Sequence, residues 1–545
     1  MQQLDRQLDR DLETLSASKT SWAGLPLERK IAMLQAVQRD VHAVAPEWAH
    51  AATRAKGLMP GSPLAGEEWL SGPWAVLYSL TRYLRTLGAI RRTGKVELPA
   101  MRVRSDGRTV LDVFPHDAYD RVLLSGVRAQ VWMQPGITPE DVRGNAASFY
   151  RRTAPIGSVA LILGAGNISS IAPLDVLYKM VCDGAVCMLK MNPVNDYLAP
   201  IFERALAPFV EAGFLRFARG GADAGAYLCG HSLVDEIHIT GSEGTHNAIA
   251  FGAALHKPIT SELGNVSPTI VIPGPWTDRD LQFQAENIAT QKAHNAGFNC
   301  VASQVLVLPQ EWEHTRELLE RVTQVFAKME QRPEYYPGAT QRRTSLAGPG
   351  TPARTILHVD PGDVDNPAFS TEAFCGVLAC VEMPGSIEQY TRDAIGFSND
   401  RLYGTLGANL IVHPQTMRRY TDLIDDAIAT LRYGCIAVNA WTGVGFFLAE
   451  TPWGAYPGHT LDAAGSGIGV VHNSYLLEQT EKSIVYAPFA PFPRSIFSGE
   501  FTLLPRPPWF VTNAMAAQVG RALCDFEIAR TPGSALKVAS LALRG

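Results

Sequence analysis

Residues 158–190 read SVALILGAGNISSIAPLDVLYKMVCDGAVCMLK and carry the clearest signal of the fold. The stretch opens on an apolar run, SVALIL, and passes through glycine turns into a helix-like segment. It closes on a second apolar run, AVCMLK. Two short apolar runs joined by a helical segment predict a β-α-β unit with parallel strands.

The same alternation continues toward the C-terminus. A strand DEIHITG, a helix from about Glu243 and a strand over 268–272 follow in turn. After Pro273 the pattern restarts, with helices over 278–293 and 311–329 and strands at 303–308 and in GVLACVEM, ANLIVH and CIAVNA. Strands that alternate with helices predict doubly wound, largely parallel sheets. We therefore expect two α/β domains with a boundary near 265–275.

The two ends of the chain have a different texture. Residues 26–56 carry apolar positions at helical spacing, which predicts helices packed on a larger body. Six prolines in 488–508 predict an extended connector without regular structure. Beyond it we expect a helix from about Thr512 that docks on its own or a neighbouring subunit, with an apolar stripe of Met515, Val519, Leu523 and Phe526.

Composition excludes several classes of protein. The 545 residues include 48 Lys and Arg against 53 Asp and Glu, a net charge of −5, so a nucleic-acid footprint is not expected. The N-terminal MQQLDRQLDRDLETL lacks the apolar core of a signal peptide, and we find no run long enough to span a membrane. Eight scattered cysteines predict a reducing, cytoplasmic setting. Cys182 and Cys187 lack the companions of a zinc site, and no metal is expected.

Three places could carry chemistry. The first is Asn167 in LILGAGNISS, which has Ser169 where the dinucleotide fingerprint wants its third glycine. The next strand ends in Lys190 instead of the acid that a conventional Rossmann site needs. The second is Cys300, in small-residue surroundings that would admit a substrate, and the third is Glu262 beside a glycine. Taken singly, a lone cysteine and a lone turn carboxylate are more often structural.

The order of these residues along the chain is the stronger signal. TSELGNVSP (260–268), NAGFNCVAS (295–303) and TEAFCGVLA (371–379) are similar to the E-L-G-G-K-S-P, N-x-G-Q-x-C and E-x-F-G-P-V segments of the aldehyde dehydrogenase superfamily. Asn167, Lys190, Gly241-Ser242 and Asn439 occupy the family's order around them. From about 25 to 485 the chain resembles that superfamily, which implies two doubly wound α/β domains, cofactor-binding and catalytic, plus an oligomerisation arm.

The resemblance implies a division of the chain. Residues 1–267 would hold the N-terminal helices and the cofactor-binding domain, with an arm segment around 120–150. Residues 268–475 would form the catalytic domain, and 476–490 would return to the cofactor domain and the oligomerisation region. Residues 491–545 would be the proline-rich connector and helical tail, which a typical member lacks. Family members are usually dimers or tetramers, so a homo-oligomer is expected.

The resemblance also implies a reaction. The Cys300 thiolate would attack an aldehyde, and the Asn167 amide and the Cys300 N–H would bind the resulting oxyanion. After hydride transfer to NAD or NADP, Glu262 would activate the water that hydrolyses the thioester to a carboxylic acid. Two alternatives remain open: a coenzyme A-acylating dehydrogenase or reductase, which Glu262 disfavours, and a non-catalytic protein of the same fold.

Cofactor contacts carry over in the same way. Lys190 would reach the adenosine ribose, and Gly241 and Ser242 would meet the pyrophosphate. Glu372 would hold the nicotinamide ribose, with the cofactor-site residues Leu263 and Phe374 completing the set. Pro193 stands where NAD-preferring relatives often place an acid, so NADP should also be accepted.

Other departures from the family concern the substrate. GAG replaces the bulky residues that usually precede the oxyanion asparagine, and Phe298 replaces a glutamine. Phe298, Trp276 and Trp441 could form an apolar or aromatic aldehyde pocket, although aromatic residues equally fill ordinary cores. The aldehyde itself is not readable from the sequence.

Overall fold

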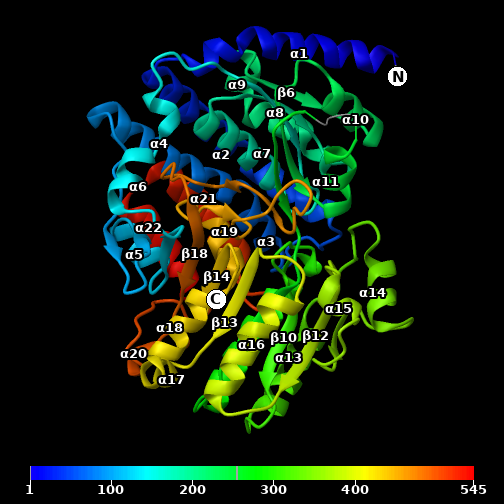
Figure 1. The fold of residues 1–545 in the computed structure, drawn as a ribbon, viewed down its shortest axis with the longest axis vertical. Helices are drawn as coiled ribbons and strands as arrows, with labels where there is room; N and C mark the ends of the chain where they lie inside the picture. Colours follow the sequence, from blue (N-terminus) through cyan, green and yellow to red (C-terminus); the bar gives the residue numbers. More distant parts are fainter. Residues whose placement is uncertain (1, 253–255) are drawn as a thin grey trace.

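The computed structural model describes residues 2–252 and 256–545 and contains two large sheets, one above the other in Figure 1. In the upper sheet the predicted β-α-β unit is confirmed: β4 and β5 are parallel, with Leu163 beside Lys190. The intervening α7 (Ile171–Tyr178) ends in a π-helical turn, Lys179–Asp183. The six strands, in spatial order, are β16 (Gly467–Ile468), β8 (Ile259–Leu263), β7 (Glu236–Gly241), β4 (Val159–Leu163), β5 (Val186–Lys190) and β6 (Leu215–Ala218).

The lower sheet confirms the second α/β unit. Its strands from β18 to β11 are parallel, and the chain, which has already formed β1 to β3 at one edge, returns to this sheet just after β8. A small two-stranded ribbon, β15 (Trp453–Gly454) with β17 (Val470–Val471), accompanies the sheets. The ten strands, in spatial order, are β1 (Met101–Val103), β2 (Thr109–Phe114), β3 (Arg128–Met133), β18 (Thr480–Tyr486), β14 (Cys435–Val438), β13 (Gly407–Ile411), β9 (Ser267–Val271), β10 (Ser303–Pro309), β12 (Gly376–Met383) and β11 (Arg354–His358).

The segment expected to form an arm lies at one edge of the lower sheet. Strand β3 pairs antiparallel with β18, and β18 pairs parallel with β14 of the same chain. The strands of this segment therefore extend the lower sheet of the same chain. Whether this edge also meets a second copy stays a prediction.

Helices cover both faces of the sheets. The predicted helix over 278–293 is α12 (Asp278–Ala293), whereas the one over 311–329 begins later, as α13 (Thr315–Lys328). The remaining middle helices are α5 (Ala118–Leu123), α6 (Pro139–Asn145), α8 (Ala199–Ala205), α9 (Ala207–Glu211), α10 (Ala222–Gly230), α11 (Glu243–Ala250), α14 (Ala339–Ala347), α15 (Pro367–Ser370), α16 (Ile387–Arg401), α17 (Pro414–Arg419), α18 (Thr421–Thr430) and α19 (Thr442–Phe447).

The N-terminal helices pack on the upper sheet. The helix predicted over 26–56 is α2 (Leu27–Ala55), which contacts α4 (Ala75–Thr93) and α8. A short helix α3 (Ala65–Trp69) runs into a π-helical turn, Leu70–Trp74, before α4. Helix α1 (Gln2–Ala23) crosses the top of Figure 1 and lies against β4, β5 and β6.

The C-terminal tail departs from expectation in two details. Its proline-rich segment is not wholly irregular, because Arg494–Phe497 form a short helix, α20. The predicted amphipathic helix, α21 (Ala516–Ala529), starts four residues later than expected, and α22 (Pro532–Ala542) follows it. The stripe residues Val519, Leu523 and Phe526 are buried, and α21 packs on α2, α3 and α4 of its own chain. Gly66 permits this contact, because a Cβ there would lie 2.3 Å from the Ala516 Cβ.

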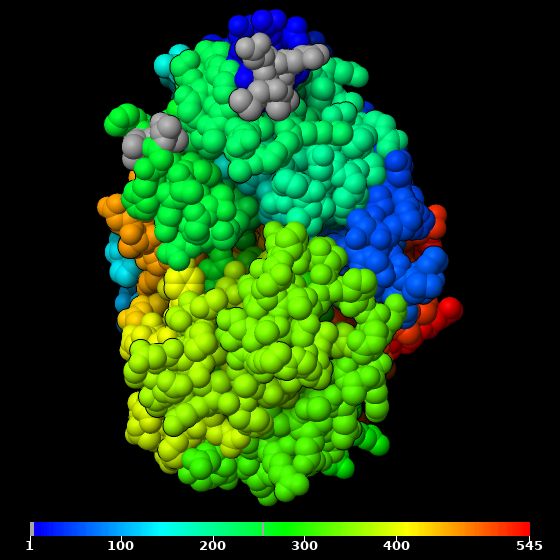
Figure 2. Space-filling view, turned by 90° about the vertical axis from the view of Figure 1, so that its right-hand side faces the viewer, coloured from blue at the N-terminus to red at the C-terminus, as the bar shows by residue number. Residues whose placement is uncertain are grey.

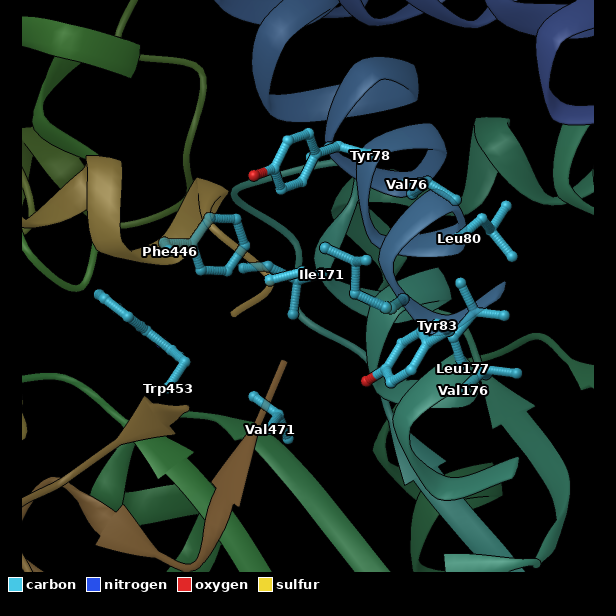
Figure 3. Close-up of a cluster of buried hydrophobic side chains, with 14 of the residues drawn as sticks. Val76, Tyr78, Leu80, Tyr83, Ile171, Val176, Leu177, Phe446, Trp453 and Val471 are labelled. Carbon is cyan, nitrogen blue, oxygen red and sulfur yellow. The ribbon is translucent and has the colours of Figure 1, made fainter. Parts of the chain in front are cut away.

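The largest apolar core joins the two halves. Side chains from α4, α7 and the 446–471 region, among them Tyr78, Ile171, Phe446, Trp453 and Val471, converge in one cluster (Figure 3). Trp453 and Phe446 pack edge to face, with ring centroids 5.4 Å apart. Ile171 of this cluster also lines the cleft described next.

Candidate active site

A cavity of about 1070 Å³ lies between the two halves, where Figure 2 shows the surface hollowed. It opens at the carboxyl ends of the parallel strands β4, β5 and β7, as expected for a ligand site on a doubly wound sheet. All nine residues expected from the sequence line it: Asn167, Lys190, Gly241, Ser242, Glu262, Leu263, Cys300, Glu372 and Phe374.

Cys300 and Glu262 are close neighbours. Cys300 follows the 3₁₀ turn His294–Gly297 just before β10, whereas Glu262 lies in β8. The Cys300 thiol donates toward Glu262 Oε1 at 3.5 Å. Burial, followed by the charges of Glu262 and Glu372, raises the pKa of the thiol well above its usual value. The resting cysteine is therefore protonated, with a base beside it to take the proton.

Glu262 has the environment of a general base. It is 3% exposed, and Oε1 accepts a hydrogen bond of 2.7 Å from Trp453 Nε1. Burial, aided by the charge of Asp175, raises the pKa of Glu262 to about 7. Its Oε2 has no hydrogen-bond partner among the described residues. A carboxyl group with a pKa near neutrality can both accept and release a proton during turnover.

Asn167 lies at the end of β4 and is linked to the cysteine loop. Its amide Nδ2 donates to the Phe298 carbonyl at 2.9 Å, the one hydrogen bond this nitrogen makes within the described part of the chain. Because an amide nitrogen carries two N–H groups, the second can serve an oxyanion formed at Cys300.

The cysteine loop needs a particular backbone. Asn295 and Ala296 have positive φ values of 53° and 56°, and Gly297 has 83°. A side chain at Gly297 would place its Cβ 2.5 Å from the Cys375 carbonyl oxygen, so glycine is required there. Three successive left-handed residues turn the chain sharply between α12 and Cys300.

The cofactor residues fit a dinucleotide. The cavity is roomy enough for a ligand of that size, and glycines at 166, 225, 241 and 264 line it. Lys190 is 8% exposed. Its burial lowers the pKa of the ammonium, and the negative charge of Asp196 partly offsets this by raising it. Ser242 caps α11 by accepting a hydrogen bond of 3.2 Å from Thr245 N, at a helix N-terminus suited to phosphate.

Glu372 completes the inner end of the cleft. Its carboxylate packs directly against Gly264. A Cβ at position 264 would lie 2.0 Å from Glu372 Oε2, so only glycine fits. Burial raises the pKa of Glu372 to about 8, although Arg342 and Lys292 oppose the shift. Oε1 has no hydrogen-bond partner within the described residues, which leaves it available to a ribose hydroxyl.

The structure adds residues that the sequence did not point to. Trp453 donates a hydrogen bond to Glu262, and the charge of Asp175 raises the pKa of Glu262. Both residues come from distant segments without a recognisable motif. Tyr336 and Arg342 line the cleft beside Phe374. Of the motif residues, Asn439 lies outside the cleft and holds the Val412 backbone with two hydrogen bonds, of 2.8 and 2.9 Å.

The expected aromatic pocket is partly wrong. Trp276 packs with Trp312 and Phe489 in a separate core, so it does not line the site. Trp441 donates to the Val301 carbonyl at 3.1 Å and supports the cysteine loop from behind. Phe298 does meet the site, where it packs with Tyr335, Tyr336 and Phe374.

A possible metal-binding group lies elsewhere. His358, Cys380 and Glu382 offer ligand atoms within 4.8 Å of one another on the neighbouring strands β11 and β12. His358 and Glu382 line a second cavity, apart from Cys300.

Cys182, which the sequence analysis weighed as a zinc ligand, instead lies against the Tyr83 hydroxyl, with the sulfur 3.8 Å from the oxygen.

Comparisons with known proteins point to one family. A model of the aldehyde dehydrogenase family matches residues 118–345. A mouse (Mus musculus) protein named "Aldehyde dehydrogenase, dimeric NADP-preferring" is 29% identical over 154 residues, which cover 28% of this chain and 33% of that protein. DhaS of Bacillus subtilis (strain 168), which carries the name of an aldehyde dehydrogenase, is 23% identical over 75% of this chain and 83% of its own.

Solved structures show the shared fold. Aldehyde dehydrogenase C of Pseudomonas syringae, solved as a mutant in complex with NAD+ and octanal, superimposes with a TM-score of 0.60. The match has 17% identity and covers 89% of this chain and 90% of that one. Among the described helices, none has the length and apolar content that crossing a bilayer requires. In its motif order and in residues 118–345 the chain is similar to the aldehyde dehydrogenase family, and it shares the fold of solved aldehyde dehydrogenases.

Proposed function

We propose that this protein oxidises an aldehyde to a carboxylic acid with NAD+ or NADP+ as the oxidant. The observation that carries the proposal is the 3.5 Å approach of the Cys300 thiol to Glu262 at the inner end of a dinucleotide-sized cleft. The similarity to the aldehyde dehydrogenase family supports it, as do the NAD+ and NADP named for similar proteins.

The protein's residues divide the proposed reaction between them. Glu262 takes the Cys300 proton, and the thiolate adds to the aldehyde carbonyl to give a thiohemiacetal. The second N–H of the Asn167 amide, with the Cys300 backbone N–H, binds the oxyanion. A nicotinamide held beside Glu372 would supply the hydride acceptor, and loss of the hydride would convert the thiohemiacetal on Cys300 to a thioester.

Glu262 then acts a second time. It releases its proton to solvent, removes a proton from an incoming water, and so delivers hydroxide to the thioester carbonyl. The carboxylic acid leaves and the Cys300 thiolate is restored. A pKa of about 7 suits both roles, because neither protonation state is costly near neutral pH.

The proposed cofactor contacts follow from the lining of the cleft. Lys190 would bind the adenosine ribose, while Gly241 and Ser242 would bind the pyrophosphate. Glu372, with Leu263 and Phe374 beside it, would hold the nicotinamide ribose. We also propose a cytoplasmic homo-oligomer that acts on a small aldehyde, with Tyr336 and Phe374 favouring an apolar one.

The test is a panel of aliphatic, aromatic and semialdehyde substrates assayed for NAD+ and NADP+ reduction, with and without coenzyme A. Oxidation without coenzyme A that yields the free acid supports the proposal. A thioester product formed only with coenzyme A would replace it with the acylating reaction. An inactive protein whose Cys300 is not protected by any aldehyde from alkylation would indicate a non-catalytic member.

A further inference from the structure

A buried lysine from the N-terminal helices lies beneath the site. Lys56 caps the C-terminus of α2 and is 2% exposed, and it lies outside the segment that the family model matches. Its Nζ bonds Asn295 Oδ1 at 2.9 Å and the Asn167 backbone carbonyl at 3.1 Å, and pairs with Glu68 at 2.8 Å. Two of these contacts are hydrogen bonds and the third is an ion pair, because Glu68 Oε1 has no hydrogen-bond partner among the described residues.

The Asn167 carbonyl is the point where donors converge. Besides Lys56, Asn295 Nδ2 and the Tyr335 hydroxyl each donate to this oxygen, both at 3.0 Å. The same hydroxyl lies 2.9 Å from Asn295 Oδ1, so its single hydrogen is shared between the two oxygens. Three donors therefore hold the backbone of the residue that is proposed to bind the oxyanion.

The same network reaches the cysteine loop. Asn295 Nδ2 donates to the Phe298 carbonyl at 3.0 Å, and Asn167 Nδ2 donates to that oxygen at 2.9 Å. The Asn295 N–H donates in turn to Glu67 Oε2, at 3.0 Å, which Arg332 also contacts, at 2.6 Å. Lys56 thus contacts both the left-handed turn before Cys300 and the asparagine opposite it.

We propose that Lys56, paired with Glu68, is a positioning residue that sets the oxyanion-binding geometry by fixing Asn167 against the Asn295–Cys300 loop. The inference rests on the aldehyde oxidation proposed above. Lys56 acts through Asn167 and Asn295, and it does not itself touch the reacting atoms.

A contribution to folding stability does not by itself explain why the buried Lys56–Glu68 ion pair is present. A buried ion pair costs so much to desolvate that neutral partners of similar size often leave a fold equally stable. Removing only one partner would strand a buried charge, whereas Lys56→Met with Glu68→Gln removes both charges. The double variant should therefore fold and reveal the geometric role.

The experiment compares K56M/E68Q with a matched pair, K179M/E236Q, in the full-length protein. Lys179 is equally buried, at 3% exposed, and pairs with Glu236 at 2.8 Å, but it does not line the cleft. Thermal unfolding, kcat, KM for aldehyde and cofactor, and the rate of Cys300 alkylation against pH are measured for each. N167A is added to both backgrounds.

We expect K56M/E68Q to fold and to lower kcat about tenfold or more, with each KM within about twofold, since a lost oxyanion donor costs about 10²–10³ in kcat. This loss should largely vanish in the N167A background, because both changes remove the same interaction. The pH midpoint of Cys300 alkylation should rise, since the loop presents the backbone N–H that favours the thiolate. K179M/E236Q should leave both measurements unchanged.

Equal losses of kcat in both pairs, or a loss that adds fully to that of N167A, would overturn the positioning role. If the wild type oxidises no aldehyde, the proposed function fails. The alkylation midpoint then decides alone whether Lys56 positions the loop: a rise confined to K56M/E68Q supports it, and an unchanged midpoint refutes it.

Discussion

Trp453 donates a hydrogen bond of 2.7 Å to the oxygen of Glu262 that also faces the Cys300 thiol. One indole therefore orients the carboxylate toward the cysteine and partly offsets the cost of burying its charge. Trp453 is itself held by Phe446, so the orientation of the base depends on the core shown in Figure 3.

Trp453→Phe should shift the pH profile of thioester hydrolysis. The hydrogen bond favours the charged carboxylate, so its loss should raise the pKa of Glu262 above about 7 by about one unit. Hydrolysis would then need a higher pH. The measurement is kcat against pH with a substrate for which hydrolysis is rate-limiting. An unchanged midpoint would remove Trp453 from the account.

Glu262→Gln should stabilise the protein at alkaline pH. The folded-state pKa of Glu262 lies above that of an unfolded chain, so the folded state binds more protons and loses stability as pH rises from about 4.5 through about 7. Neutral Gln avoids this loss and can still accept from Trp453. The Tm of the variant should exceed that of the wild type at pH 8 and match it at pH 5. A gain equal at both pH values would contradict the raised pKa.

Truncation after residue 490 should destabilise the chain. Val519, Leu523 and Phe526 bury their side chains against helices of the same chain, and deletion would uncover that surface. A milder variant, Leu523→Ala, should cost about 2–5 kcal/mol of unfolding free energy. Leu536→Ala, at a side chain 70% exposed, is the matched control and should cost little. Thermal unfolding and gel filtration that do not respond to truncation would make the tail dispensable.

NADP+ should be accepted beside NAD+. Lys190 favours a 2′-phosphate, while the charge of Asp196, which acts on Lys190, opposes it. Lys190→Ala should therefore weaken NADP+ more than NAD+, and Asp196→Asn should shift the ratio of kcat/KM toward NADP+. The effects are modest, because a partly exposed charge pair is worth about 0–1 kcal/mol. Strict use of NAD+ by the wild type would show that another residue rejects the phosphate.

The sequence predicted what local patterns determine. Strands β4, β5 and β10 contain continuous apolar runs and β9 ends in one, because parallel strands are buried on both faces, and the predicted positions lie close to the observed ones. Helix α1 was missed although Leu8, Leu12 and Leu15 have helical spacing, because the charges between them dominate the segment. The delayed start of α21 shows that end positions are less well determined than the elements themselves.

The residues of the candidate site also fall into two groups, those that the sequence reveals and those that it does not. Cys300, Glu262 and Glu372 stand in short motifs, so they could be found from the sequence. Trp453, Asp175 and Lys56 act on those motifs from remote segments, and tertiary packing alone brings them together. The position of Trp276 was wrong for a related reason, since an aromatic residue carries the same sequence signal in a core as in a pocket.

The most direct test of the account is a single-turnover reaction with aldehyde and cofactor, followed by intact-mass analysis of the protein. Glu262→Gln should still form one reduced nicotinamide per site, more slowly than the wild type because Cys300 loses its neighbouring base, and should accumulate an acyl group on Cys300, since a well-placed base is worth about 10²–10⁴ in the rate of hydrolysis. Cys300→Ala should give neither the reduced nicotinamide nor the adduct. Wild-type turnover by Cys300→Ala, or an adduct on another residue, would contradict the central claim.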